Sequence, residues 1–569
     1  MLTLSGINSY TGTTTVDAGA LVVHGSIAAS SGVTVNSGFL AGTGTVGNTT
    51  VNSGGTLASG NGTAGSSMNV TGSLAFQSGA FYMVQLNPAT SSFTNVTGAA
   101  TLGGSTVKAI YANGSYVVKQ YTILTAASVS GTFASVAETN LPSNVHATLS
   151  YDATHAYLNL VLSFIPPPGS GLSGNQNAVG NAIVSYFNSN GGIPIIYSAL
   201  TAGGLTQASG ETAAGSQQTT FQAMTQFMGI MTDPFAPGRG DGTNAPAYAE
   251  EDSTANAYAS SGKRRTRSER EAYAAVYSKA PVAAPFVGRW NAWAAGFGGS
   301  QTTDGNTTLG SNTSTSRIFG MAAGADYFFS PNTVAGFALA GGGTSFSVAN
   351  GGSGRSDLFQ AGAFVRHTAG QAYVTGALAY GWQDVTTDRT VTIAGIDRLR
   401  AQFNANAFSG RAEAGYRFVT PWMGGVGITP YAAAQFTTFD LPAYAEQVVS
   451  GANTFALGYA STSVTTTRSE LGLRADKSYA MQNAVLTLRG RAAWAHDFNP
   501  DRAVGATFQA LPGASFVVNG ARQASDSALT TASAEVKWLN GWSMAAAFEG
   551  EFSNVTRSYA GKGVVRYAW

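Results

Sequence analysis

Few side chains in this sequence could carry out chemistry, and they are widely spaced. The five histidines are His24, His146, His155, His367 and His496, and no two of them form the pair of an HExxH zinc motif. The Gly-x-Ser-x-Gly and Gly-Asp-Ser nucleophile motifs and the Walker phosphate loop are absent. The chain has no cysteine, which excludes disulfides, thiolate catalysis and cysteine-bound metal. The sequence therefore predicts no catalytic, cofactor or metal site, and we expect that the protein is not an enzyme.

Two short segments could suggest a ligand. The tripeptide Arg239-Gly-Asp241 resembles an integrin-type motif, but it lies in a Gly-rich stretch where such a tripeptide arises by chance. The basic run 263–270 could bind anionic lipid, although a solvated or lumen-facing helix is the favoured interpretation. A net charge of +1 gives no overall attraction to nucleic acid, so none is expected as a partner.

Residues 1–165 repeat a pattern of short strands and turns. The phrase Val-Asn-Ser-Gly occurs at 35–38 and again at 51–54, and β-branched runs alternate with Gly, Asn and Asp throughout. Such repeats are typical of a β-solenoid, here a right-handed parallel β-helix with about seven coils of roughly 20–25 residues each. The alternative is a disordered Gly/Ser linker. Regularly spaced Val, Leu and Ile argue against it, because they supply apolar surface that a linker lacks.

Residues 166–287 read as a linker with helices. Apolar residues at 179, 182, 183, 186 and 187 have helical spacing, and Phe221, Met224, Met228 and Met231 share one face of a second helix. A third helix is expected at 266–279. Its length of about 21 Å is close to the apolar band of an outer-membrane barrel, about 25 Å, and it carries Arg and Glu. We therefore expect 266–279 to fill a pore. The competing segment is 211–232, whose Met/Phe face needs an apolar partner.

Residues 288–569 change to a period of two. We count twelve strands, with short connections after the even-numbered strands and mostly longer ones after the odd-numbered strands. No run of 18 apolar residues is present, so a membrane could be crossed only by a closed barrel. Alternating short turns and long loops are the pattern of transmembrane antiparallel barrels, with the short turns in the periplasm.

Charged residues in these strands share one parity, and apolar residues share the other. A charge facing lipid at mid-depth costs about 2–4 kcal/mol for Arg or Lys, so we expect these charges to line the lumen. The alternative, a soluble sandwich with the parity inverted, leaves the long strands without a second apolar sheet. The predicted lumen-facing charges are Arg411, Glu413, Arg417, Arg468, Glu470, Arg474, Arg489, Arg491, Glu535, Lys537, Glu549, Glu551 and Arg566.

Several phrases together resemble the autotransporters of type V secretion. Residues 4–21 resemble the autotransporter-associated β-strand repeat, and Gly210-Glu-Thr-Ala-Ala-Gly-Ser-Gln resembles the helical motif upstream of many autotransporter barrels. Trp290-Asn-Ala-Trp resembles the first barrel strand, and Val564-Val-Arg-Tyr-Ala-Trp569 the last, although Phe is commoner than Trp at the end. No signal peptide is visible at Met1, so the true N-terminus is expected upstream.

The resemblance implies an all-β, monomeric outer-membrane protein that delivers or displays its own β-helical passenger on the cell surface, in a structural or adhesive role. Its implied partners are outer-membrane lipid, the barrel-assembly machinery and periplasmic chaperones; a host ligand is not identified, and no cofactor is implied. The last strand should carry the assembly signal on one face, at Val565, Tyr567 and Trp569. Two alternatives remain: a translocator whose enzymatic passenger domain lies upstream, and a passive porin, against which the solenoid and helices argue.

Overall fold

The computed structural model describes residues 1–166, 168, 171–233, 289–420 and 425–569. Two compact units are present. The first contains residues 1–172, 176–208 and 511–516, and the second contains 173–175, 209–510 and 517–569. No described helix is long and apolar enough to cross a membrane. The predicted helix 266–279, Arg239–Asp241 and the basic run 263–270 lie outside the described residues.

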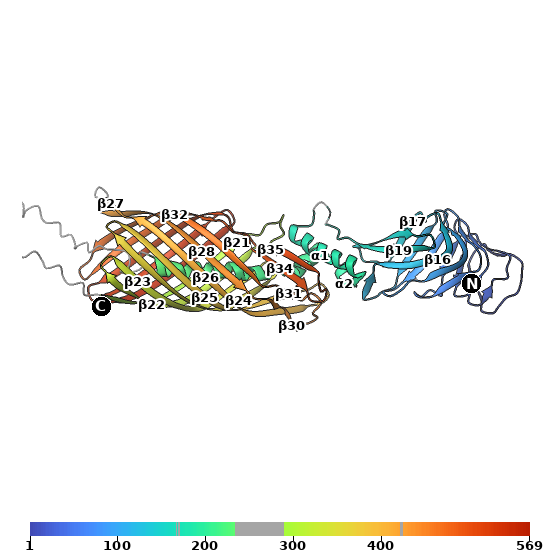
Figure 1. The fold of residues 1–569 in the computed structure, drawn as a ribbon, viewed down its shortest axis with the longest axis horizontal. Coiled ribbons are helices and arrows are strands. Elements are labelled where there is room, and N and C mark those ends of the chain that lie inside the picture. Colours follow the sequence, from blue (N-terminus) through green and yellow to red (C-terminus); the bar gives the residue numbers. More distant parts are fainter. Residues whose placement is uncertain (167, 169–170, 234–288, 421–424) are drawn as a thin grey trace, which may run out of the picture. The chain divides into compact units, whose positions relative to one another are not determined.

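The first unit is a stack of mostly parallel strands (Figure 1), and its last strands, β19 with β16 and β18 with β19, pair antiparallel. One sheet has the order β1 (Leu2–Leu4), β3 (Ala20–Val23), β6 (Phe39–Gly42), β9 (Thr56–Ser59), β12 (Phe81–Leu86), β14 (Thr106–Tyr111) and β17 (Ser135–Thr139). The other contains β2 (Thr14–Val16), β5 (Val33–Val35), β8 (Thr49–Val51), β11 (Leu74–Phe76), β13 (Phe93–Thr101), β16 (Gln120–Ser130), β19 (His155–Leu162) and β18 (Val145–Tyr151), with β4 (Ser26–Ile27), β7 (Thr45–Val46) and β10 (Ser67–Val70) in a side branch. The predicted β-helical stub is confirmed, and the seven strands of the first sheet agree with the expected coil number.

The repeated Val-Asn-Ser-Gly phrase forms the same corner in successive coils. Val35 and Val51 are paired neighbours, and both are buried inside the stack. The next residues form an external ladder, in which the Asn52 amide donates to Asn36 Oδ1 (2.7 Å) and the Asn36 amide donates to Asp17 Oδ1 (2.6 Å). Apolar residues thus fill the core of each coil, while side-chain amides connect the turns.

Helices follow the last solenoid strand. They are α1 (Gly174–Asn190), α2 (Ile195–Ser198), α3 (Ala202–Ala208), the 3₁₀ turn η1 (Glu211–Ala213) and α4 (Ala214–Thr232), and a short strand β20 (Gly192–Pro194) pairs with β15 (Tyr116–Val118). The first helical pattern is confirmed, since Val179, Ala182, Ile183 and Phe187 are buried on α1.

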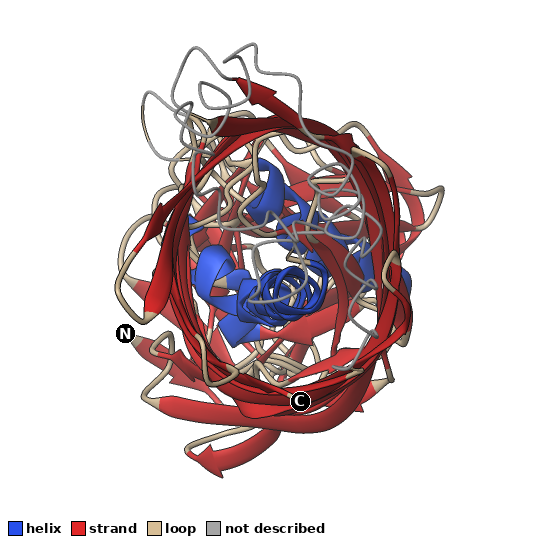
Figure 2. Cartoon of the chain, turned by 90° about the vertical axis from the view of Figure 1, so that its left-hand side faces the viewer, coloured by secondary structure: helices blue, strands red, loops and turns tan. Residues whose placement is uncertain are grey.

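Twelve long antiparallel strands form the closed barrel of the second unit, as the sequence predicts (Figures 1 and 2). They are β21 (Trp290–Thr303), β22 (Ser314–Ser330), β23 (Thr333–Val348), β24 (Gly352–Ala369), β25 (Ala372–Val391), β26 (Asp397–Tyr416), β28 (Val426–Leu441), β32 (Thr462–Ala480), β33 (Ala484–Asp497), β36 (Asp526–Trp538), β37 (Trp542–Phe552) and β38 (Thr556–Ala568). Closure comes from β38, which pairs with β21 as well as with β37. Short strands β27 (Phe418–Thr420) and β30 (Gln447–Ser450) extend the sheet.

The two ends of the barrel differ. The C-terminus lies at the end with the short connections, such as 331–332 and 481–483, which we name the turn end. The opposite end, the loop end, has longer loops that carry extra strands: β29 (Tyr444–Ala445), β31 (Leu457–Tyr459), β34 (Ala503–Phe508) and β35 (Ser515–Asn519). Since β29 pairs with β31 and β31 with β34, these loops form a small sheet, which we name the collar.

Candidate functional site: the occupied barrel lumen

Helix α4 lies inside the barrel and is fastened to several strands (Figure 2). The Gln218 amide donates to Thr303 Oγ1 (2.9 Å), the Ser316 hydroxyl donates to Gln222 Oε1 (2.7 Å), and the Gln435 amide donates to Thr225 Oγ1 (3.2 Å). Nearly all residues of α4 are buried. The helix therefore occupies part of the cross-section of the lumen, and the barrel is not an open channel across its full width.

One side of α4 packs on an apolar stretch of the barrel wall. Met224, Phe227, Met228 and Met231 have no exposed surface and contact a cluster of small inward-facing residues that includes Ala338, Ala340, Ala405 and Ala407. Two glycines permit this close approach. A Cβ at Gly362 would lie 2.6 Å from Met231 Sδ, and a Cβ at Gly381 would lie 2.8 Å from Met224 Sδ.

The structure places in the lumen the helix that the sequence analysis ranked second, while the helix 266–279 stays a prediction. The sequence-based argument favoured 266–279, which lies outside the described residues, whereas α4 is the competing segment 211–232. The argument against that segment was wrong because it assumed a polar lumen on every side. Ala and Gly on β22 to β26 give the Met/Phe face of α4 an apolar partner.

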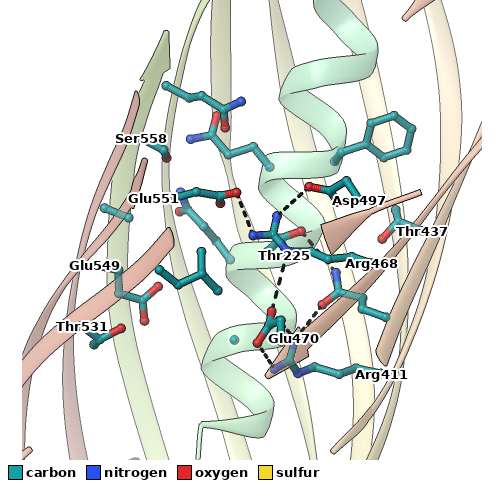
Figure 3. A pocket seen from close by; sticks show the side chains of 18 of the residues that line it. Thr225, Arg411, Thr437, Arg468, Glu470, Asp497, Thr531, Glu549, Glu551 and Ser558 are labelled. Atoms are coloured by element: carbon teal, nitrogen blue, oxygen red, sulfur yellow. Dashed lines mark hydrogen bonds and ion pairs between the residues drawn. The ribbon is translucent and has the colours of Figure 1, made fainter. Parts of the chain in front are cut away.

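The opposite side of α4 faces charged residues across a cavity of about 140 Å³ (Figure 3). Most of the charges predicted to face the lumen meet here. Those that line the cavity are Arg411, Glu413, Arg468, Glu470, Arg474, Arg491, Glu549 and Glu551. Asp233, Asp497, Arg502 and Lys562 line it as well, and the sequence analysis did not select them. Lys562 has the parity of Arg566 and could have been found by the same rule; Asp233 and Arg502 lie outside the regular strands, where parity gives no signal.

The cavity charges pair with one another. Arg411 contacts Glu413 (2.9 Å) and Glu470 (2.8 Å), and Arg474 contacts Glu413 (2.6 Å), all with side chains at most 7% exposed. Arg468 on β32 contacts Glu551 on β37 (2.7 Å), across the two strands β33 and β36 that lie between them (Figure 3). Because buried charges are tolerated only when they are paired, this network lets a polar wall exist beside the helix.

The other predicted lumen charges lie away from the cavity. Arg417 pairs with Asp476 (2.5 Å), Arg489 with Glu535, and Arg566 with Asp326. Asp326 also accepts a hydrogen bond from the indole of Trp293 (3.1 Å), so Arg566 on β38 is linked to β22 across the closing seam. Lys537 is exposed near the turn end of β36 and joins none of these ion pairs among the described residues.

The residues predicted as the assembly signal lie on the outer face of β38. Val565, Tyr567 and Trp569 are 37%, 38% and 55% exposed. Tyr567 packs against Trp542, with 5.0 Å between ring centroids, and against Trp569, with 5.7 Å. Leu378, Leu471, Leu473 and Phe548 are likewise exposed on the outer wall, which is therefore apolar where the inner wall is charged.

Both ends of α4 are held. At the loop end, Gly210 adopts φ +69°, and a Cβ there would lie 2.3 Å from Leu457 and 2.6 Å from the Tyr459 hydroxyl of the collar. A buried ion pair between Arg389 and Glu446 connects this collar to β25. At the other end, Asp233 pairs with Lys562 on β38 (2.6 Å). The helix is thus held at its N-terminus by the collar and at its C-terminus by the wall.

Glu211, in the turn η1 outside the barrel strands, should make docking of α4 pH-dependent. Its carboxylate accepts hydrogen bonds from the Asn312 backbone N–H (2.7 Å) and side-chain amide (2.6 Å), but burial raises its pKa from 4.5 to about 7. Between about pH 4.5 and 7, Glu211 is therefore protonated when α4 is docked and ionised when α4 is undocked. Because of this difference, docking weakens as the pH rises from about 4.5 through 7, by on the order of 3 kcal/mol. The protection factors of the α4 amides, which compare each exchange rate with the intrinsic rate at the same pH, should be lower at pH 8 than at pH 5, and Glu211→Gln should remove this difference. Equal pH dependence in wild type and variant would contradict this.

A carboxylate on the apolar side of α4 should displace the helix from the lumen. Phe227 is fully buried against the wall, and an unpaired buried charge there costs several kcal/mol. We expect Phe227→Glu to raise single-channel conductance in planar bilayers at least severalfold. Gln226→Glu adds the same charge on the side that faces the polar cavity, where arginine and lysine side chains can pair with it, and should keep the wild-type conductance. Equal conductance in both variants would show that the apolar contact does not seat the helix.

The ion pair Arg489–Glu535 changes one expectation from the sequence. Parity alone predicts that Arg489→Leu is mild, because the side chain faces inward. Both partners are only 4–5% exposed, however, so this change leaves Glu535 buried without its cation, at a cost of about 3–5 kcal/mol. Urea titration of the folded barrel should show a lower midpoint for Arg489→Leu, largely restored in Arg489→Leu/Glu535→Leu. A double variant as unstable as the single one would exclude this explanation.

Residues 292–549 match the family described as autotransporter beta-domain, and residues 1–23 match the passenger-associated transport repeat. An extracellular serine protease of Serratia marcescens is 27% identical over 183 residues, which are 32% of this chain and 17% of that protein. The chain thus matches less than a fifth of the length of that relative.

Solved structures with similarity include two autotransporter domains. The translocator domain of NalP from Neisseria meningitidis is 18% identical, with 56% of this chain and 97% of that chain covered and a TM-score of 0.40. The β domain of the Bordetella autotransporter Brka is 16% identical, with 49% and 100% covered and a TM-score of 0.38.

Proposed function

Because this chain is an outer-membrane autotransporter with a C-terminal β-domain, we propose that the barrel delivers its own N-terminal β-helix to the cell surface and displays it there. The proposed boundaries are a passenger at 1–165, a linker with helices at 166–287 and the barrel at 288–569. The passenger is proposed to have a structural or adhesive role. The barrel-assembly machinery and periplasmic chaperones are its proposed partners during insertion.

The direction of α4 is the observation that carries this proposal. The helix enters the lumen at the loop end, where Glu211 contacts Asn312, and runs toward the turn end, where β21 begins beside Trp569. Ser209, where the second unit resumes, therefore lies on the loop-end side of the helix, and the chain enters the lumen from that end. Since the long loops of outer-membrane barrels face the outside, the proposal places the passenger outside the cell.

The composition of the passenger suits this route. Residues 1–165 carry only five charged side chains and no cysteine, so they have few groups that bind a pore wall and none that form disulfides before translocation; the charged residues are Asp17, Lys108, Lys119, Glu138 and Asp152. Each new coil pairs with the preceding one along parallel strands, as Val33–Val35 does with Thr49–Val51. Stacking can therefore supply folding free energy outside the cell, coil by coil.

The main alternative is a translocator of an enzymatic passenger encoded upstream. The similarity to a secreted serine protease favours this alternative, whereas the β-domain is not itself catalytic. A nucleophile motif in the coding sequence before Met1 would support the enzymatic passenger. A passive porin is less well supported, because α4 occupies the lumen.

Surface labelling of intact cells tests the proposal. An epitope inserted after Gly62, in an exposed solenoid turn, should bind antibody on intact cells that express the full chain. The same epitope inserted in the turn 481–483 should bind only after the outer membrane is permeabilised. Labelling of the second epitope but not the first on intact cells would reverse the orientation and refute the proposal.

A further inference from the structure

Two arginines on β22 and β24 project from the outer wall of the barrel, not into the lumen. Arg317 is exposed and shares parity with Phe319 and Met321, which are 71% and 75% exposed. Arg355 is exposed and shares parity with Phe359, which is 44% exposed. Both guanidiniums therefore lie on the face that contacts lipid, where a charge without a partner costs free energy.

The strand register places the two arginines close together. Arg317 is paired with Ser345 on β23, and Ser345 is paired with Arg355. Neighbouring strands lie about 4.8 Å apart, so the two Cα atoms are roughly 10 Å apart with only a small hydroxyl residue between them. We name Arg317, Ser345 and Arg355 the outer arginine row. Neither arginine forms an ion pair within the described part of the chain.

The outer arginine row lies just past the apolar band. On β22 the outward residues from Phe319 to Phe329 are apolar or aromatic. Ten residues at about 3.3 Å each, tilted by about 45°, rise roughly 24 Å, which matches the apolar band of about 25 Å. Arg317 is the next outward residue toward the loop end, so it lies at the level of lipid headgroups.

Nearby charges are mostly engaged by other side chains. Asp388 pairs with Arg400 (2.7 Å), and Asp384 accepts both hydrogen bonds from the Gln402 amide (3.1 Å each). Asp357 lies on the same face two residues from Arg355 and is paired across the strands with Asp384, whose charge the neutral Gln402 amide does not cancel, so both carboxylates should repel an anion bound there. The donors of Arg317 and Arg355 remain available for a ligand that approaches from the membrane.

We propose that the outer arginine row binds the phosphate of a glycolipid headgroup in the outer leaflet. Guanidinium groups donate paired hydrogen bonds to phosphate oxygens, and the Ser345 hydroxyl can donate a further one. The phosphate of a lipid headgroup is the anion that lies at this level, at the edge of the apolar band. The inference rests on the proposed function, since it takes the loop end to face outside.

Lipid binding by the purified full chain tests this inference. Native mass spectrometry would measure the apparent Kd for bisphosphorylated lipid A and for its dephosphorylated form. We expect the wild type to bind the phosphorylated form more tightly, and Arg317→Ser/Arg355→Ser to weaken that binding by about tenfold or more. Asp357→Asn should strengthen it. Lys477→Ser, which removes an outward cation near the turn end, should leave it unchanged.

Each outcome separates this inference from the proposed function. Heat-modifiable migration on gels reports a folded barrel for every variant. Equal binding of the two lipids, or equal Kd values for wild type and the double variant, would overturn the phosphate site while leaving the proposed function intact. A wild-type chain absent from the outer membrane, or inserted with the loop end inward, would instead contradict the proposed function.

Discussion

Deletion of Tyr567–Trp569 should leave almost no folded barrel in the outer membrane. Tyr567 and Ala568 end β38, the strand that closes the barrel against β21, and Trp569 follows directly. Trp569 exchanges backbone hydrogen bonds with Trp290 (3.1 and 3.3 Å), and Ala568 N–H donates to the carbonyl of Gly541 (3.0 Å). Loss of these partners exposes unpaired backbone groups to lipid, and each such group costs several kcal/mol.

The measurement is the amount of heat-modifiable protein in the membrane fraction, together with protease sensitivity in the periplasm. Trp569→Phe keeps an aromatic ring and the backbone pairing, so it should insert as the wild type does. Tyr567→Ala/Trp569→Ala should give an intermediate level, because it removes the aromatic contact with Trp542 but keeps the ladder. Normal outer-membrane levels of the deletion would mean that the end of β38 is dispensable for assembly.

The barrel could be predicted from the sequence because its rule is local. Alternate residues of β26 are buried and exposed along most of its length, and this period of two is visible in the sequence without knowledge of the partners. The same rule selected charges such as Arg411 and Glu470 that meet in the lumen. The period of two also holds in the closing strand β38, where Arg566 and Tyr567 lie on opposite faces.

Features that depend on a distant partner could not be predicted. Parity places Arg489 inside, but only the register with β36 identifies Glu535 as its partner. The Met/Phe face of α4 needs an apolar partner, and the sequence alone does not show that Ala and Gly residues from five strands form that partner on the lumen wall. The sequence shows only that the connections after odd-numbered strands are mostly long, whereas in the structure β34, from one such loop, pairs with β31, from another.

The collar links these distant features to function. Gly210 is the point where the chain enters the lumen, and the contacts of Leu457 and Tyr459 leave no room there for a side chain. Glu446 receives Arg389 Nε–H (2.9 Å) and the Leu457 backbone N–H (2.9 Å), so one buried carboxylate holds both the collar and the rim of β25. The segment that follows the passenger is therefore enclosed by loops, not only by the barrel wall.

A charge on the outer wall at mid-depth should abolish or strongly reduce insertion. Leu378 lies midway between Val374 and Trp382, the outward apolar residues of β25, and it is 67% exposed. Leu378→Arg should cost about 2–4 kcal/mol in the bilayer centre, and its neighbours Ala363 and Gly410 offer no partner for a cation. We expect little or no heat-modifiable Leu378→Arg protein in the membrane fraction. Thr390→Arg places the same side chain on the same face of β25, beyond the apolar band, and should insert at wild-type levels. Equal insertion of the two variants would mean that this face does not contact lipid, and the inside–outside assignment of the barrel would be wrong.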